Sequence, residues 1–313
     1  MVSISFLSCL SLLKISCFQY CMDVKIVICF SLFSADFGKD QMTEDIKKLQ
    51  SIATEVRVNI LKMLEKSGSG HPGGSLSAVE ILTALFFSKM RHDPKNPEWE
   101  ERDKFVLSKG HGAPVLYAVL GLSGYFSTDH FDSLRKLGGI LRGHPNSSAT
   151  PGVEVCTGSL GQGLSQANGL AVAAKLDKKN TRVYVLLGDG EIQEGQVWEA
   201  VMTARHYNLD NICAIVDNNG LQIDGPVVEI MNIDPIKEKF GAFGWHTIEI
   251  DGHNFDEVFS ALDEADEING KPTAIIAKTI KGKGVSFMEG KVEYHGVAPS
   301  AEELEKALVE LNA

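Results

Sequence analysis

The chain has little positive charge for its length. Its 313 residues include 30 lysines and arginines against 41 aspartates and glutamates, which gives a formal net charge of −11. A surface of this sign repels polyanions, so the composition argues against nucleic acid and anionic membranes as partners. A phosphorylated ligand would have to be held by a local group of basic residues or by a bound cation.

Long apolar runs are also absent. No uninterrupted apolar stretch reaches the roughly 18 residues of a membrane span, because Lys14 and the charged segment 23–25 interrupt the apolar N-terminal region. Residues 1–41 differ from the remainder, since they hold four of the six cysteines and a balanced charge. We interpret them as a disordered leader or as a mis-assigned extension upstream of a start at Met42. A secretory signal with an apolar region at 26–33 is the alternative.

Cysteine is scarce in residues 42–313, which we expect to form one domain. Cys156 and Cys213 form no recognisable metal or disulfide spacing, and Cys213 lies in an apolar run that reads as a strand. This pattern is typical of a reduced protein, and we predict a cytoplasmic location.

Apolar runs alternate with amphipathic segments along this domain. Strands are predicted at 103–107, 183–187, 212–216, 246–250 and 273–279. Helices are predicted from Thr43 to the stretch 68–70, from a capping box at Ser77 and Glu80 to Phe87, at 165–176, 196–206 and 256–268, and after Ser300. The alternation predicts an α/β fold with a doubly wound, mostly parallel sheet flanked by helices.

Two of the predicted strands end in small polar turns. Gly188-Asp189-Gly190 follows the strand at 183–187, and Asp217-Asn218-Asn219-Gly220 follows the strand at 212–216. Ligands of open parallel sheets bind outside these strand ends. The Asp189 carboxylate and the Asn219 amide oxygen are ligands that a hard divalent cation prefers. The glycines allow a phosphate to approach the backbone, so the two turns predict a metal–diphosphate site.

Four histidines stand beside glycine in predicted loops: His71, His111, His144 and His295. A single histidine in such a loop is more often an ordinary turn residue than a functional one. Four of them in one chain favour proton transfer, because imidazole titrates near neutral pH. A zinc site is disfavoured, since the histidines have no cysteine partners and no His-x-x-x-His spacing.

The motifs SGSGHPGG, SKGHGAPVLY, GHPNSSATPGVEVCTGSLGQGLSQANGLA, GDGEIQEGQVWEA and DNNGLQIDG occur in this order. Together they resemble the N-terminal, thiamine diphosphate-binding domain of transketolases, and the resemblance runs from about Met42 to the C-terminus. It implies that Asp189, Asn219 and the backbone carbonyl of Leu221 hold Mg²⁺, for which Ca²⁺ or Mn²⁺ could substitute. It further implies contacts to thiamine diphosphate from His111, Gly158, Leu160, Gly190, Asn219 and His295.

The same resemblance implies catalytic roles. His71, His144 and His295 would line the reaction channel as proton-transfer and hydroxyl-binding groups. Glu194 and Glu199 resemble acidic residues that couple paired sites across a subunit interface. The alternative for Glu194 is stabilisation of a helix N-terminus.

Full-length transketolases continue with a pyrimidine-binding domain and a third domain, neither of which this sequence contains. The resemblance therefore implies the N-terminal subunit of a split transketolase, active with a C-terminal partner subunit in a heterotetramer; a fragment of a longer enzyme is the alternative. The expected reaction transfers a two-carbon glycolaldehyde unit between sugar phosphates, as in the pentose phosphate pathway. Two other functions stay open: another thiamine diphosphate-dependent transferase, such as a deoxyxylulose-phosphate synthase type, or a non-catalytic cofactor-binding partner.

Overall fold

The computed structural model describes residues 45–312. Residues 49–313 form one compact unit. The interpretation of residues 1–41 and the predicted helix cap at Thr43 lie outside the described residues. Residues 49–67 are helical, and the helix ends as predicted, with Gly68 in the left-handed conformation at a φ of +65°.

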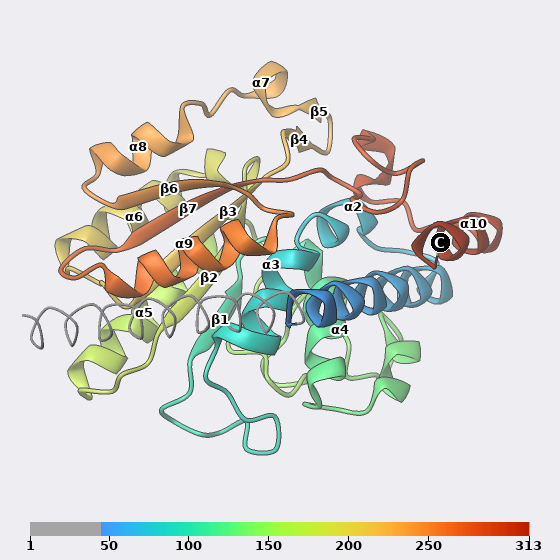
Figure 1. Cartoon of the computed structure of the whole chain (residues 1–313), viewed down its shortest axis with the longest axis horizontal. Coiled ribbons are helices and arrows are strands. Elements are labelled where there is room, and N and C mark those ends of the chain that lie inside the picture. The colour runs from blue at the N-terminus through green and yellow to red at the C-terminus, as the bar shows by residue number, and fades with distance from the viewer. Residues whose placement is uncertain (1–44, 313) are drawn as a thin grey trace, which may run out of the picture. The chain divides into compact units, whose positions relative to one another are not determined.

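The centre of the fold is a parallel five-stranded sheet (Figure 1). Its order is β1 (Lys104–Leu107), β2 (Val183–Gly188), β3 (Ile212–Asn218), β7 (Thr273–Lys278) and β6 (His246–Asp251). Every neighbouring pair is parallel. The inner strands β2, β3 and β7 are almost continuously apolar, as expected for strands that are covered on both faces. The predicted α/β class is confirmed.

Helices cover both faces of this sheet. Val183, Val185 and Leu187 of β2 belong to a buried core cluster that also contains apolar residues of helices α5, α6 and α8. The opposite face is covered by α3 and α9, with α9 in front of the sheet in Figure 1. The helices span Pro72–Leu76 (α2), Val79–Ala84 (α3), Ala113–Ser123 (α4), Gln162–Leu176 (α5), Gly195–His206 (α6), Val227–Ile230 (α7), Ile236–Ala242 (α8), Phe255–Glu267 (α9) and Ala301–Leu311 (α10).

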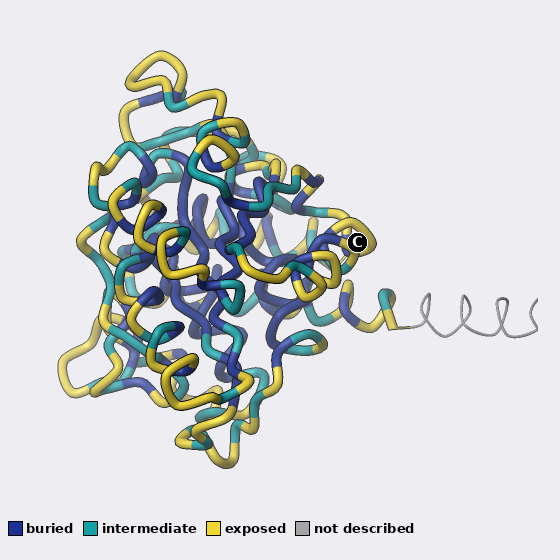
Figure 2. Tube along the Cα trace, turned by 90° about the vertical axis from the view of Figure 1, so that its left-hand side faces the viewer, coloured by how far each residue is buried: buried dark blue, intermediate teal, exposed yellow. Residues whose placement is uncertain are grey.

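Short elements complete the chain. A two-stranded hairpin of β4 (Leu221–Gln222) and β5 (Gly225–Pro226) follows β3, and the sequence did not indicate it. Short 3₁₀ or π helices occupy Leu85–Lys89, Gly110–Gly112, Thr128–Ser133, Glu191–Gln193 and Val292–His295. Figure 2 shows the buried core running along the sheet, with exposed backbone around its margin. Among the helices in residues 45–312, none combines the length and apolar character that a bilayer crossing requires.

The predicted capping box at Ser77 and Glu80 is wrong. α3 begins at Val79, and no side chain caps it. The Ser77 hydroxyl instead donates to the carboxylate of Asp217, at 2.6 Å. Asp217 is fully buried, and a buried carboxylate without donors is far more costly than an uncapped helix end. The predicted cap at Ser300 is confirmed, since Ser300 and Glu303 form a reciprocal capping box at α10.

Two glycines of α5 provide a test of its packing. A Cβ at Gly163 would lie 2.6 Å from the Cα of Ser108, whereas a Cβ at Gly169 would meet nothing within 4 Å. We expect Gly163→Ala to lower the free energy of unfolding by about 1–3 kcal/mol, the usual range for overpacking. Gly169→Ala should raise it by about 0.5–1 kcal/mol, because alanine favours helix. Urea unfolding measures both, and equal effects of the two changes would contradict this packing.

Candidate active site

The two predicted turns lie at the carboxyl end of the sheet, beside a cavity of about 340 Å³. Nearly all of the predicted site residues border this cavity: His71, His111, Gly158, Leu160, Asp189, Gly190, Glu194, Asn219, Leu221 and His295. Lys109, Glu191 and Lys281 border it as well and were not predicted. Because parallel strands end at the same sheet edge, the fold brings together side chains that are far apart in sequence.

His144 and Glu199 are placed differently. His144 does not border the cavity but lies at its rim, where a Cβ added to Gly158 would come within 3.1 Å of the His144 ring. Gly158 has a φ of +150°, so this close approach depends on glycine. Glu199 is exposed on α6 and borders a shallow groove between α5 and α6.

Asp189 is a buried carboxylate with only 3% of its surface exposed. One oxygen accepts a hydrogen bond from the backbone N–H of Gly190 at 2.8 Å, and the other accepts from Gly220 at 2.5 Å. Burial, followed by the nearby charge of Asp217, raises the pKa of Asp189 to about 6. A raised pKa means that the protein stabilises the ionised carboxylate poorly. A nearby cation would therefore stabilise the ionised form of Asp189.

Asn219 and Leu221 flank the glycine that binds Asp189. The Asn219 side-chain oxygen accepts from the Leu221 N–H at 3.2 Å, and the Asn219 amide group donates to Asp217 at 3.3 Å. This network fixes which end of the amide carries the oxygen. The two turns therefore present a carboxylate, an amide oxygen and a backbone carbonyl beside one another. This donor set suits a hard divalent cation.

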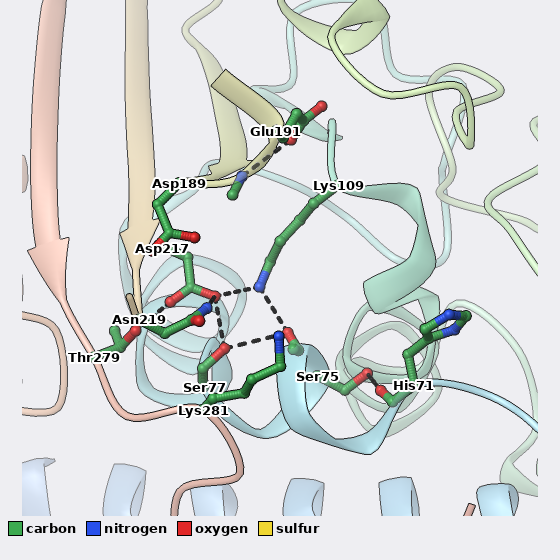
Figure 3. A network of polar contacts seen from close by, with 12 residues as sticks. His71, Ser75, Ser77, Lys109, Asp189, Glu191, Asp217, Asn219, Thr279 and Lys281 are labelled. Atoms are coloured by element: carbon green, nitrogen blue, oxygen red, sulfur yellow. Dashed lines mark hydrogen bonds and ion pairs between the residues drawn. The ribbon is translucent and has the colours of Figure 1, made fainter. Parts of the chain in front are cut away.

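A buried ion pair lies beneath the turns (Figure 3). The Lys109 ammonium contacts Asp217 and donates to the carbonyl of Gly74 at 2.6 Å. Asp217 also accepts from the hydroxyls of Ser77 and Thr279. Burial would raise the pKa of Asp217, but Lys109 and the hydroxyl donors outweigh it and hold the pKa below its usual range. The pair joins the ends of β1, β3 and β7 to the α2–α3 connection.

Glu191 is a second buried carboxylate, and sequence reasoning gave it no role. It accepts from the Ser108 hydroxyl at 2.5 Å, from the Gly161 N–H at 3.0 Å and from the Gly188 N–H at 3.0 Å. These partners belong to the three loops that carry Lys109, Gly158 and Asp189. Burial raises the pKa of Glu191. The acidic residue directly after the Gly-Asp-Gly turn was the available signal.

Three of the predicted histidines border the cavity and lie close to one another. The ring centroids are 5.2 Å apart for His71 and His111, 5.5 Å for His71 and His295, and 5.2 Å for His111 and His295. Burial is the largest cause that lowers the pKa of each ring, to about 4 for His71 and for His295 and well below the usual value for His111. Nearby positive groups, including Arg135 and Lys281, add to the effect. The three rings are therefore neutral near pH 7.

The histidine environment gives a titration prediction. In the cofactor-free chain, His71 and His295 should titrate near pH 4 rather than near the ordinary 6.5. Because folding lowers these pKa values, their contribution to stability is lost as the pH falls from about 6.5 to 4, where the unfolded chain takes up protons first. NMR of the imidazole protons, assigned with His71→Asn and His295→Asn variants, measures this. Titration of either ring at 6.5 or above would contradict the buried site.

Residues 48–311 match the family model described as transketolase, thiamine diphosphate binding domain. The chain belongs to the transketolase family. The matched part of the family is its thiamine diphosphate-binding domain. The geometry above is thus that of a transketolase thiamine diphosphate-binding domain.

Several relatives are similar over most of this transketolase chain. The 6-deoxy-6-sulfo-D-fructose transketolase subunit of a Clostridium species is 47% identical over 270 residues, covering 86% of this chain and 98% of the relative. An apulose-4-phosphate transketolase subunit from Phocaeicola vulgatus is 42% identical, with 85% of this chain and 95% of the relative covered. Human transketolase is 44% identical, but the match covers only 40% of its length.

Solved structures agree with this assignment. Transketolase from Campylobacter jejuni superimposes with a TM-score of 0.80 at 37% identity, covering 84% of this chain and 42% of that one. The Leishmania mexicana enzyme gives a TM-score of 0.80 at 31% identity. The chain therefore spans about two fifths of the length of the solved transketolases it matches.

Proposed function

We propose that this chain is the thiamine diphosphate-binding subunit of a two-chain transketolase. With its partner chain it transfers a two-carbon glycolaldehyde unit from a ketose phosphate to an aldose phosphate. One observation carries the proposal: the cation donor set of Asp189, Asn219 and Leu221 borders the same cavity as three neutral histidines. The named transketolase subunits, matched over almost their whole length, support it.

The proposed cation is Mg²⁺, held by the carboxylate of Asp189, the side-chain oxygen of Asn219 and the carbonyl of Leu221. The fit rests on the under-stabilised buried carboxylate, whose pKa is raised to about 6. A divalent cation there would offset the desolvation of Asp189 and bind a diphosphate at the same time.

The rest of the cavity suits a diphosphate as well. Lys281 is buried at its edge and supplies positive charge to a chain that is otherwise acidic, and Lys109 lies beside it with its charge paired to Asp217. Backbone at Gly158, Leu160 and Gly190 provides close approach. We assign these groups and His111 to the cofactor's diphosphate side.

Bound thiamine diphosphate supplies a carbon nucleophile that carries the two-carbon unit between sugars. We assign to the histidines of this chain the transfer of protons to and from the bound sugar. The His71 ring borders the cavity, and its Nδ1 is buried without a hydrogen-bond partner in the described part of the chain. Neutral rings at His71 and His295 can accept a proton from a sugar hydroxyl and return it. We assign His144, at the rim, to hydroxyl binding.

Glu194 precedes α6 and borders the cavity. We propose that it couples the paired sites across a subunit interface. Stabilisation of the helix N-terminus is the simpler alternative, and either role is compatible with its position.

The partner is proposed to be a C-terminal subunit that contributes the pyrimidine side of the cofactor site and most of the sugar phosphate contacts. The coverage supports this proposal, because the chain matches about two fifths of the solved transketolases and almost the whole length of the named transketolase subunits. We propose a heterotetramer of two copies of each chain, located in the cytoplasm. Cys213 is buried and forms no disulfide within residues 45–312, which agrees with a reducing compartment.

Reconstitution tests the proposed function. The purified chain alone should show negligible transfer between pentose and triose phosphates. Addition of the C-terminal subunit, thiamine diphosphate and Mg²⁺ should produce transfer, and chelation of the metal should abolish it. Full activity from this chain by itself, or a reconstituted complex that is active without thiamine diphosphate, would contradict the proposal.

The identity of the sugars needs a separate test, because the relatives are named for different ketoses. One is named for 6-deoxy-6-sulfo-D-fructose and another for apulose 4-phosphate. A specialised ketose transferase, or a deoxyxylulose-phosphate synthase type, is therefore the second candidate. Mass spectrometry of products from several ketose donors, with and without pyruvate, separates these activities.

A further inference from the structure

Arg57, Glu80 and His253 form a hydrogen-bonded triad outside the cavity. Arg57 comes from the helix at 49–67, Glu80 from α3, and His253 from the turn between β6 and α9. The Arg57 guanidinium donates to one oxygen of Glu80 at 2.6 Å, and His253 Nδ1 lies 2.9 Å from the other. The side chains of Arg57 and Glu80 are only 8% and 10% exposed. None of the three residues borders the cofactor cavity.

The triad is electrostatically satisfied. Burial alone would raise the pKa of Glu80, but the hydrogen bond from His253 and the charge of Arg57 outweigh it, and the pKa stays below its usual range. Glu80 is thus ionised at neutral pH, and Arg57 supplies its counter-charge.

Both ends of the triad bind one short segment after β7. The backbone N–H of Ile280 donates to His253 Nε2 at 2.8 Å. Three residues further on, the carbonyl of Lys283 accepts from Arg57 Nε at 3.0 Å. A backbone N–H cannot accept, so His253 Nε2 must be the unprotonated nitrogen. His253 therefore carries its proton on Nδ1 and donates it to Glu80.

Lys281 lies between these two attachment points. Its side chain is buried and reaches the cavity, where the ammonium donates to the Leu221 carbonyl at 3.0 Å and lies 2.9 Å from Nδ1 of His295. The following Gly282 N–H donates to Gly73 at 3.0 Å. A side chain can be placed to within a fraction of an ångström only if its backbone is fixed on both sides.

We propose that Arg57, Glu80 and His253 are positioning residues for the cofactor site: they fix segment 280–283 and thereby place the Lys281 ammonium in the cofactor cavity beside His295. The inference rests on the proposed function, because it assigns the triad a role in binding thiamine diphosphate. Supporting residues of this kind do not contact the ligand, but they fix the orientation of the groups that do.

His253→Ala tests the proposal in the reconstituted two-chain enzyme. The change removes the acceptor for Ile280 but leaves Glu80 paired with Arg57, so it does not strand a buried charge. We expect the apparent KM for thiamine diphosphate to rise about tenfold, in the range for lost supporting hydrogen bonds, while kcat at saturating cofactor changes less than about twofold. In the cofactor-free chain, hydrogen–deuterium exchange of segment 280–284 should accelerate about tenfold.

His246→Ala is the matched control. His246 is also an imidazole paired with a carboxylate, Glu264, at 2.6 Å, and it lies on the preceding strand β6. The His246→Ala substitution should change neither the hydrogen–deuterium exchange of segment 280–284 nor the KM for thiamine diphosphate. His253→Gln, whose side-chain oxygen can accept from Ile280, should restore part of the lost affinity.

The positioning role of the triad and the proposed function are contradicted by different results. Unchanged exchange in His253→Ala, or a loss of kcat that saturating cofactor does not recover, overturns the positioning role. If His253→Ala does not fold, the comparison of His253→Gln with wild type decides the same question. Failure of the wild-type complex to bind thiamine diphosphate would instead overturn the proposed function, while the exchange measurement would still report on the triad.

Discussion

Asp189→Asn is expected to weaken binding of Mg²⁺ and thiamine diphosphate by more than about 100-fold, since even supporting residues around metal ligands are worth about 10–100-fold. Asp189 supplies the carboxylate of the proposed ligand set, and an amide cannot replace its charge. Isothermal titration of the two-chain complex with thiamine diphosphate, with and without Mg²⁺, measures the effect. The control is Asp224→Asn, in the exposed turn between β4 and β5, which should bind normally.

The same substitution should leave the metal-free fold nearly as stable as wild type. Folding raises the pKa of Asp189 from 3.8 to about 6. A difference of about 2 between two pKa values corresponds to at most about 3 kcal/mol. Because the folded pKa is raised, the folded chain binds the proton more tightly, and wild-type stability rises as the pH falls from about 6 to 4. Asparagine removes the cost of burying the Asp189 charge. Its side-chain N–H₂ group, however, would face a backbone N–H that now has no acceptor.

Urea unfolding in a chelator tests this second expectation. At pH 7 the Asp189→Asn variant should lie within about 1 kcal/mol of wild type, because the relieved desolvation and the lost hydrogen bond offset each other. Relative to the variant, wild type should gain stability on acidification to pH 5. A variant that retains normal cofactor affinity would contradict the cation site, and one that unfolds at pH 7 would show that Asp189 is needed for the fold itself.

Lys109→Met is expected to lower the free energy of unfolding by about 3–5 kcal/mol, the cost of leaving one member of a buried ion pair without its partner. Asp217 is fully buried, and the hydroxyls of Ser77 and Thr279 cannot supply a positive charge. Urea unfolding of the chain measures the loss. Lys278→Met is the control, because Lys278 forms an exposed pair with Glu249 and such pairs contribute about 0–1 kcal/mol.

The pH dependence distinguishes the ion pair from simple packing. In wild type the pKa of Asp217 is lowered, so its stabilisation is present above about pH 4 and is lost as the pH falls further. Without Lys109, burial dominates and raises the pKa of Asp217, so the variant should regain stability as the pH falls below 7. Equal losses at pH 7 and pH 5 would indicate that Lys109 acts through packing alone.

Local patterns predicted the fold and the two turns with Asp189 and Asn219, whereas most of the other cavity residues were predicted from the resemblance to transketolases. The apolar strands β2 and β3 end directly in glycine turns, and parallel pairing brings Asp189 and Asn219 to one sheet edge wherever the other elements lie. Sequence position alone did not show which elements meet that edge. The contact of Lys281 with Leu221 depends on the position of β7 between β3 and β6 in the sheet order.

The errors and omissions share a cause. Ser77 resembles a helix cap in its local sequence, yet its hydroxyl binds Asp217, which is 140 residues away. Glu191 and Glu80 look like surface glutamates, and only the folded chain shows that each is buried among specific donors. Long-range polar contacts of this kind override local propensity, because an unpaired buried charge is costly. The roles of individual site residues remain predictions.

The position of the cation is the most direct test of this account. Crystals of the two-chain complex grown with thiamine diphosphate and Mn²⁺ would reveal the ion by anomalous scattering. We predict one Mn²⁺ per site, within about 2.0–2.6 Å of the Asp189 carboxylate, the Asn219 side-chain oxygen and the Leu221 carbonyl, as oxygen-bound divalent ions require. A diphosphate bound without a cation at these three atoms, or Mn²⁺ held elsewhere in the cavity, would contradict it.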